Sequence, residues 1–156
     1  MMRAGFLMAA VLFVAWRGAW ASEASEYLDK YGRDIMAAAA LTKYAKVATL
    51  VAAIGWLESD AGRAAWVEDR KQVFAMKANR KRAKGERPIN LLLRFKSFDE
   101  STAAVLDLFR RRGFPADRAG FLDRLDSSGY HATGTAYRVR LLKRKRLIIN
   151  ELKKGE

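Results

Sequence analysis

The sequence contains no cysteine, a single histidine and only two prolines among its 156 residues. Without cysteine, the protein can form no disulfide bond, no thiol nucleophile and no zinc–thiolate site. The lone histidine, His131, has no histidine partner anywhere in the chain, so we expect no metal site and no cofactor. An apolar core must therefore supply the stability, and the length suits one domain.

Acidic residues are also scarce, since 17 of them stand against 30 basic residues and leave a net charge of +13. A chain this basic favours binding to polyanions. For an exported protein these are wall polymers, lipopolysaccharide or membrane surfaces, whereas a cytosolic protein would suggest nucleic acid. The location of the protein therefore decides which partner is expected.

Residues 1–21 have the pattern of a secretory signal. Arg3 precedes an uncharged apolar run from Ala4 to Trp16, and Ala19-Trp20-Ala21 fits the cleavage pattern. The run has 13 residues, which is short of the ~20 that a membrane-spanning helix needs. We therefore expect a signal peptide at 1–21 and an exported domain at 22–156, periplasmic, secreted or retained by an uncleaved signal anchor. Removing residues 1–21 still leaves a net charge of +11.

The spacing of apolar residues predicts a mainly helical domain. Residues 23–40 and 47–58 both carry apolar side chains at helical spacing. The second stretch is apolar on nearly every side, which predicts that it is buried. Ser97 and Glu100 have the spacing of a capping box, so a third helix should begin there and end near residue 113.

Two more helices are expected, one through residues 121–125 and one from 137 to 152. Between residues 74 and 95, Gly85, Pro88 and several basic residues separate two short apolar runs. These breakers predict a hairpin or an irregular lobe. The expected architecture is thus a helical bundle core with a small β-hairpin or irregular lobe.

Glu58 is the first candidate for chemistry, because it ends the apolar helix predicted for residues 47–58. Its carboxyl should lie at the boundary between the core and a cleft. Partial burial there favours the protonated carboxyl that a general acid for glycosidic cleavage needs. The alternative is an ordinary helix-end carboxylate that faces water.

Four segments occur in one order along the chain: Trp-Leu-Glu-Ser-Asp-Ala-Gly at 56–62, Val-Phe-Ala-Met-Lys at 73–77, Phe-Lys-Ser-Phe-Asp-Glu-Ser at 95–101, and Gly-Tyr-His-Ala-Thr at 129–133 before Tyr137. The first resembles the Leu-Glu-Ser-Gly-Trp-Gly signature of bacterial glucosaminidases of the flagellar and autolysin type. The others are similar to that family's Leu-Phe-Gly-Ile-Lys segment, its aromatic-x-Ser-x-x-Glu-Ser helix entry and its Gly-Tyr-Ala-Thr-Asp-Pro-x-Tyr segment. The resemblance covers roughly residues 26 to 150.

The resemblance implies an α+β, lysozyme-like fold and hydrolysis of the β-1,4 bond on the N-acetylglucosamine side of the peptidoglycan glycan strand. Glu58 matches the catalytic acid, and Tyr130 matches a tyrosine that supports the chemistry of the cleft. Ser59, Phe74 and Tyr137 are the expected substrate-binding residues, with Phe74 lining the sugar groove. For Tyr130, packing at the edge of the core is an equally ordinary role.

Glycosidases need a second group beside the acid, usually a carboxylate. Members of this family often place it in the hairpin lobe, where Glu86 is the only glutamate of this chain. Glu86 is therefore the candidate second carboxylate. Activation of water by another group, or participation of the substrate's own acetamido group, stays open.

The chain also departs from the family pattern. Asp60 and Ala61 stand where the family has Gly-Trp, Ala75 replaces a glycine, and residues 71–72 are Lys-Gln in place of paired asparagines. Three alternatives follow from these departures, from the helix-ending Glu-Ser that lytic transglycosylases share, and from the charge. They are a catalytically weak cell-wall-binding protein of the same fold, a lytic transglycosylase-like enzyme and, more remotely, a basic nucleic-acid-binding module.

Basic runs at residues 80–84, 110–112 and 143–146 are ordinarily solvated surface. They could also hold the protein on anionic cell-envelope polymers, with binding that weakens as salt rises. With peptidoglycan glycan strands as the substrate, we expect no nucleic-acid partner and a monomeric protein.

Overall fold

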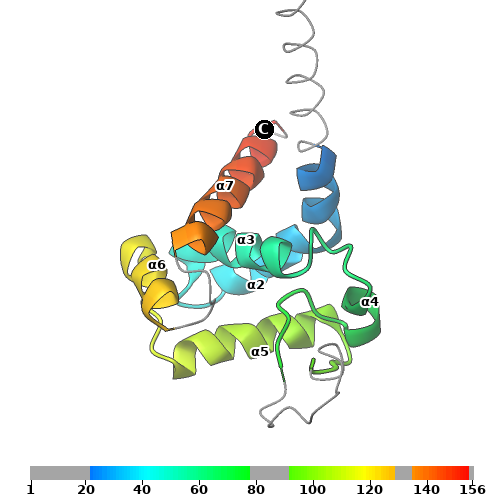
Figure 1. The fold of residues 1–156 in the computed structure, drawn as a ribbon, viewed down its shortest axis with the longest axis horizontal. Coiled ribbons are helices and arrows are strands. Elements are labelled where there is room, and N and C mark those ends of the chain that lie inside the picture. The colour runs from blue at the N-terminus through cyan, green and yellow to red at the C-terminus, as the bar shows by residue number, and fades with distance from the viewer. Residues whose placement is uncertain (1–21, 78–91, 129–134, 155–156) are drawn as a thin grey trace, which may run out of the picture.

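The computed structural model describes residues 22–77, 92–128 and 135–154, and these residues are mainly helical, as the sequence predicts (Figure 1). The predicted signal peptide, residues 1–21, lies outside the described residues. The centre of the fold is α3 (Ala48–Glu58), against which α2 (Arg33–Ala40) and α7 (Thr135–Leu152) both pack. Among the described residues, no helix is long and apolar enough to cross a membrane.

The first helical stretch runs from residue 22 to residue 40, in agreement with the prediction for 23–40. It contains one π-helical turn, η1 (Leu28–Gly32), and continues as α2. Four of its apolar side chains at helical spacing are buried, namely Tyr27, Leu28, Tyr31 and Ile35. This stretch therefore presents one apolar face to the rest of the core.

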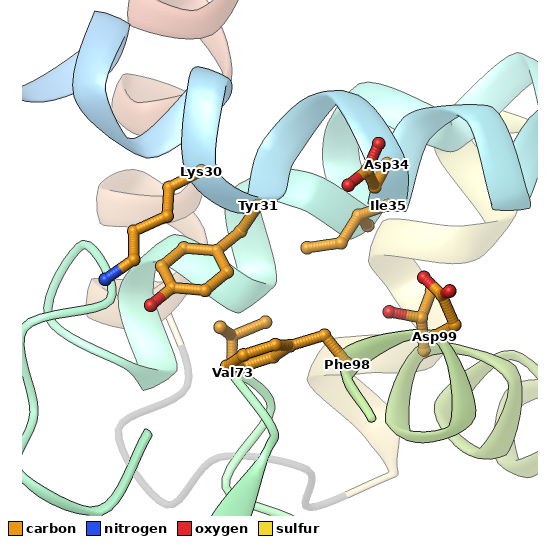
Figure 2. A pocket seen from close by; sticks show the side chains of 8 residues that line it. Lys30, Tyr31, Asp34, Ile35, Val73, Phe98 and Asp99 are labelled. Atoms are coloured by element: carbon orange, nitrogen blue, oxygen red, sulfur yellow. The ribbon is translucent and has the colours of Figure 1, made fainter. Parts of the chain in front are cut away.

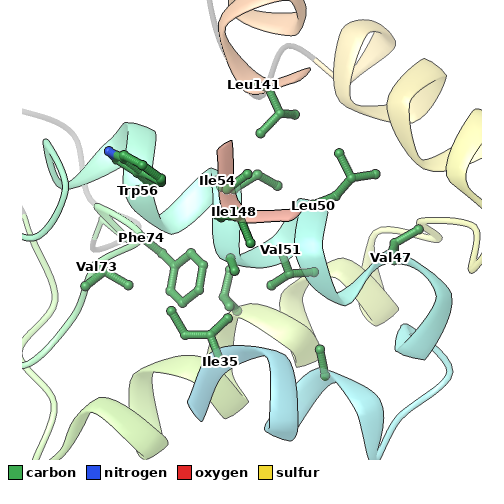
Figure 3. Packing of buried hydrophobic residues seen from close by; sticks show 14 of the residues in the cluster. Ile35, Val47, Leu50, Val51, Ile54, Trp56, Val73, Phe74, Leu141 and Ile148 are labelled. Carbon is green, nitrogen blue, oxygen red and sulfur yellow. The ribbon is translucent and has the colours of Figure 1, made fainter. Parts of the chain in front are cut away.

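The second helix, α3, follows the short 3-10 turn η2 (Ala45–Val47) and is buried from Leu50 to Trp56, as predicted. An apolar surface on every side requires packing partners on every side. Figure 3 shows Leu50 and Ile54 of α3 among Ile35, Leu141 and Ile148, which come from α2 and α7. The end of α3 is consequently held from several directions.

Gly55 allows the first helical stretch to come close to α3. The hydroxyl of Tyr27 donates to the carbonyl oxygen of Ala52 over 2.8 Å, and a Cβ at Gly55 would lie 2.6 Å from that hydroxyl oxygen. The Tyr27 ring also stacks on Trp56, with the centroids 5.3 Å apart. Trp56 is only 1% exposed, so its ring belongs to the core.

After α4 (Trp66–Arg70), the base of the predicted lobe is a single antiparallel bridge between Lys77 and Leu92. The backbone N–H of Leu93 donates to the Met76 carbonyl over 2.8 Å. The buried amide of Gln72 donates to the Leu93 carbonyl and accepts from the Met76 N–H. Gln72 thus joins the two segments that meet at this bridge, while residues 78–91, where the hairpin is predicted, lie outside the described residues.

The remaining predicted helices are confirmed. The capping box opens α5 (Phe98–Arg111), because Ser97 Oγ accepts from the Glu100 N–H and the Glu100 carboxylate accepts from the Lys96 N–H. Gly113, at φ +68°, follows the end of α5. Next along the chain is α6 (Arg118–Ser127). A cluster of rings joins these helices to the loop before α3, with centroids 4.8 to 6.2 Å apart; its members are Tyr44, Phe109, Phe114 and Phe121.

Candidate active site

Glu58 is the last residue of α3, and its side chain is partly buried at the end of that apolar helix. The hydroxyl of Tyr137 donates a hydrogen bond to Glu58 Oε1 over 3.0 Å. Tyr137 lies in the first turn of α7 and is 4% exposed. The fold therefore brings two predicted site residues, 79 positions apart in the sequence, into direct contact.

The backbone turns sharply after Glu58. Asp60, Ala61 and Gly62 have φ values of 50°, 58° and 82°, so three successive residues adopt the left-handed conformation. For a residue other than glycine this conformation costs about 1–3 kcal/mol and persists only where the surroundings fix it. Here the Ala61 N–H donates to the Trp56 carbonyl over 2.9 Å, which ties the turn back to α3.

Gly62 is required at its position for two reasons. Its positive φ favours glycine, and a Cβ there would lie 2.3 Å from Cε2 of Tyr31. The Tyr31 ring thus packs directly against the backbone of the turn. The conformation of the segment after Glu58 depends on this contact with the first helical stretch.

Ser59 and Phe74 were expected to contact the substrate, and both are inside the protein. Ser59 is fully buried; its Oγ donates to the Gly55 carbonyl over 2.6 Å and accepts from the Gly62 N–H over 2.8 Å. Phe74 is 2% exposed and packs beside Gly55, where an added Cβ would lie 3.3 Å from its ring. In this structure Ser59 shapes the turn and Phe74 belongs to the core, while their substrate-binding roles stay predictions.

The other two expected catalytic residues, Tyr130 and Glu86, lie outside the described residues, which leave out 78–91 and 129–134. Their roles stay predictions. Of the six site residues expected from the sequence, the structure describes Glu58, Ser59, Phe74 and Tyr137, and they all lie on or next to α3.

A charge cluster beside the turn was not foreseen from the sequence. Glu23 forms an ion pair with Arg63, which also pairs with Asp60 over 3.0 Å. Glu23 Oε2 lies 3.8 Å from Nη1 of Arg144, and the Arg144 guanidinium lies 5.1 Å from the centroid of the Trp56 ring. The cluster joins the first helical stretch, the turn after Glu58 and α7.

Burial lowers the pKa of Arg144, and the Glu23 carboxylate opposes that effect. Only 18% of the Arg144 side chain is exposed, so the expectation that residues 143–146 form one solvated basic face is wrong for this residue. Arg144 follows Tyr137 by seven residues, or about two helical turns, and therefore shares its face of α7. That spacing is the sequence signal that could have identified it.

A second polar cluster surrounds Glu68. Its carboxylate accepts hydrogen bonds from the Tyr31 hydroxyl over 2.8 Å and from Lys71 Nζ over 3.1 Å, and it lies 3.1 Å from Lys30 Nζ. Hydrogen bonds from these three groups lower the pKa of Glu68 from 4.5 to about 2. Glu68 therefore stays ionised and joins α4 to the first helical stretch.

A pocket with a volume of ≈ 20 Å³ lies between the first helical stretch and α5. Figure 2 shows the side chains that line it. That volume holds about one water molecule and is far too small for a sugar ring. Its lining includes none of the expected site residues; the lining residues are Lys30, Tyr31, Asp34, Ile35, Val73, Phe98, Asp99 and Thr102. This pocket is consequently no candidate for glycan binding.

No protein-family model, no curated protein and no solved structure matches the chain significantly. The function of the protein is accordingly inferred from its own residues and from the geometry around Glu58.

Proposed function

We propose that the protein is an exported peptidoglycan hydrolase that cleaves the β-1,4 bond on the N-acetylglucosamine side of the glycan strand, with Glu58 as the general acid. The contact between Glu58 and Tyr137 carries this proposal. A partly buried carboxyl at the end of an apolar helix, positioned by the Tyr137 hydroxyl 3.0 Å away, has the placement that a general acid needs. The four ordered motifs supply the substrate class.

The backbone gives this proposal independent support. The glucosaminidase pattern has glycine at the positions that Asp60, Gly62 and Ala75 occupy here. All three have positive φ, at 50°, 82° and 47°, which is the region that glycine adopts most readily. Asp60 and Ala75 thus keep the backbone conformation of a glycine while carrying a side chain. The departures from the motif are therefore compatible with its local geometry.

In the proposed reaction, the Glu58 carboxyl gives its proton to the glycosidic oxygen as the bond to the anomeric carbon breaks. Water then adds to that carbon and gives one proton to a base. Proton exchange afterwards returns a proton to the Glu58 carboxylate. Tyr137 positions Glu58 through its hydroxyl. The base is Glu86 or another group that activates water. In the alternative, the acetamido oxygen of the substrate bonds to the anomeric carbon as the glycosidic bond breaks, and water then displaces it.

The test is digestion of purified peptidoglycan by the purified protein, followed by mass spectrometry of the released fragments. Fragments with a new N-acetylglucosamine reducing end support the proposal. Glu58→Gln should lower the rate about 10²–10⁴-fold, the usual contribution of a general acid. Glu26→Gln, at an exposed glutamate of the first helical stretch, is the matched control and should retain the wild-type rate.

The same products distinguish the alternatives. A terminal anhydro sugar would indicate a lytic transglycosylase-like enzyme, because that product forms without water. Binding to peptidoglycan without any released fragment would indicate a catalytically weak wall-binding protein. Retention in the cytosol together with salt-sensitive binding to duplex nucleic acid would favour the basic nucleic-acid-binding module.

A further inference from the structure

Glu23 stands at the start of the first helical stretch, beside the turn that follows Glu58. It precedes Tyr27 by four residues and Tyr31 by eight, so the three side chains share one face of the helix. Tyr31 packs on that face directly against Gly62 of the turn. The side chain of Glu23 is 18% exposed, so its carboxylate lies largely inside the protein at the same turn.

The Glu23 carboxylate contacts two guanidinium groups from different parts of the chain. Its Oε1 pairs with Arg63, which follows the turn and also pairs with Asp60 over 3.0 Å. Its Oε2 lies 3.8 Å from Nη1 of Arg144, which shares a face of α7 with Tyr137. Glu23 therefore links the turn after the proposed acid to the helix that carries the tyrosine bound to that acid.

The charges around Glu23 indicate what this link prevents. Burial lowers the pKa of Arg144 and the charge of Arg63 lowers it further, whereas the Glu23 carboxylate raises it. Without that carboxylate, two guanidinium groups would repel each other at a site that is partly removed from water. We expect them to move apart, and the turn would then shift together with Arg63.

We propose that Glu23 is a positioning residue for the Glu58–Tyr137 pair. Its carboxylate holds the turn and α7 at the spacing at which the Tyr137 hydroxyl donates to Glu58 Oε1 over 3.0 Å. The catalytic consequence rests on the proposed function, whereas the effect on the turn does not. Small displacements matter at such a site, because a shift of about 1 Å in a reacting group can cost about 10²-fold in rate.

The first experiment measures backbone amide hydrogen exchange of the full chain by NMR. Two amides report on the turn, because the Ala61 N–H donates to the Trp56 carbonyl over 2.9 Å and the Gly62 N–H donates to Ser59 Oγ over 2.8 Å. Both should exchange at least about fivefold faster in Glu23→Gln than in wild type, since the turn opens more often. Unchanged exchange at both amides would overturn the proposal.

Two further variants make this measurement specific. Asp29→Asn is the matched control, because Asp29 pairs with Arg33 over 3.3 Å and lies on the opposite face of the same helical stretch from Tyr27 and Tyr31. It should leave both exchange rates as in wild type. Arg63→Gln breaks the Glu23 ion pair from its more exposed end and should speed exchange as Glu23→Gln does. It therefore tests the same ion pair should Glu23→Gln fail to fold, which thermal melting would show.

The second experiment tests the link to the catalytic pair through the kinetics of glycan release. Glu23→Gln should lower kcat roughly 5- to 20-fold while KM stays within about twofold, because the acid is displaced and the substrate contacts are kept. In a Tyr137→Phe background the same change should cost less than about threefold, since the hydrogen bond that it disturbs is already absent. A double variant whose loss equals the product of the two single losses would contradict the positioning role.

The two experiments separate this proposal from the proposed function. Faster amide exchange in Glu23→Gln, together with no glycan release by the wild-type protein, would sink the hydrolase and leave the structural link through Glu23 standing. Glycan release that depends on Glu58, with exchange and kcat both unchanged in Glu23→Gln, would sink only the positioning role.

Discussion

Two tyrosine–glutamate pairs lie at the two ends of the segment from residue 58 to residue 68. Tyr137 donates to Glu58 over 3.0 Å, and Tyr31 donates to Glu68 over 2.8 Å. The donors are the same, but the surroundings differ. Glu58 ends a buried apolar helix, whereas Glu68 is half exposed and also contacts Lys30 and Lys71.

The difference shows that the groups surrounding a tyrosine–glutamate pair determine which role its glutamate can have. Hydrogen bonds from Tyr31 and two lysines lower the pKa of Glu68 to about 2, which fixes it as a carboxylate that holds elements together. A carboxylate that is always ionised cannot serve as an acid near neutral pH. On the proposed function, the proton donor is therefore the glutamate at the end of the apolar helix.

The largest expected effect concerns catalysis at the two glutamates. Glu58→Gln should lower peptidoglycan release about 10²–10⁴-fold, because it removes the proposed acid. Glu68→Gln should change the rate by less than roughly threefold, since the ion pairs that it removes are largely solvent-exposed. Fragment release measured by mass spectrometry compares the two. Equal losses at both positions would break the distinction between the pairs.

The next largest effect concerns the turn between the pairs. Gly62→Ala should reduce the free energy of unfolding by about 3 kcal/mol, since it adds a steric clash with Tyr31 to left-handed strain. Gly113→Ala is the control, because its φ of +68° is similar but nothing lies within 4 Å of an added Cβ. It should cost only about 1 kcal/mol. Urea unfolding measures both, and similar values would mean that Tyr31 does not constrain the turn.

Removing the hydroxyl groups sharpens the comparison further. Tyr137→Phe should lower the rate of glycan release roughly tenfold, because the lost hydrogen bond to Glu58 is worth about 1–2 kcal/mol. Tyr31→Phe removes the corresponding bond to Glu68 and should leave the rate within about twofold of wild type. Initial rates on the same substrate measure both effects. A greater loss of rate in Tyr31→Phe than in Tyr137→Phe would contradict the assignment of Glu58 as the acid.

The smallest effect is the pH dependence of stability. Because the folded pKa of Glu68 is lowered from 4.5 to about 2, its contribution is present above pH 4.5 and is lost as pH falls from 4.5 toward 2. The side chain is 52% exposed, so solvent screening limits the contribution to less than about 1 kcal/mol. Unfolding at a series of pH values should show a shallower acid loss in Glu68→Gln than in wild type. An unchanged acid limb would mean that the cluster contributes nothing.

Much of the fold was predictable because helices are encoded locally. Apolar spacing gave the helices at residues 22–40 and 48–58, and the capping box at Ser97 and Glu100 gave the start of α5. The partial burial of Glu58 was likewise predictable, because it follows the apolar residues of its own helix. Its contact with Tyr137 was not, because it depends on where α7 crosses α3.

For the charged residues, too, the sequence predicts one part and the tertiary structure decides the other. The runs at residues 110–112 and 143–146 look alike in the sequence, yet Arg110 and Arg111 pair with Asp107. Within the second run, Arg144 lies over Trp56 while Arg146 faces outward. Composition reports the total charge, but it carries no information on which guanidinium groups meet a carboxylate.

The sequence by itself determined the helical class of this protein, the positions of its helices and the carboxyl at the end of the buried one. Tertiary structure alone decided which tyrosine meets which glutamate, that Asp60 and Ala61 follow a glycine-like backbone, and which carboxylates the arginines meet. The physical reason is the distance along the chain over which each kind of interaction acts. Helix propensity and capping act within a few residues, whereas these contacts depend on how packed helices cross.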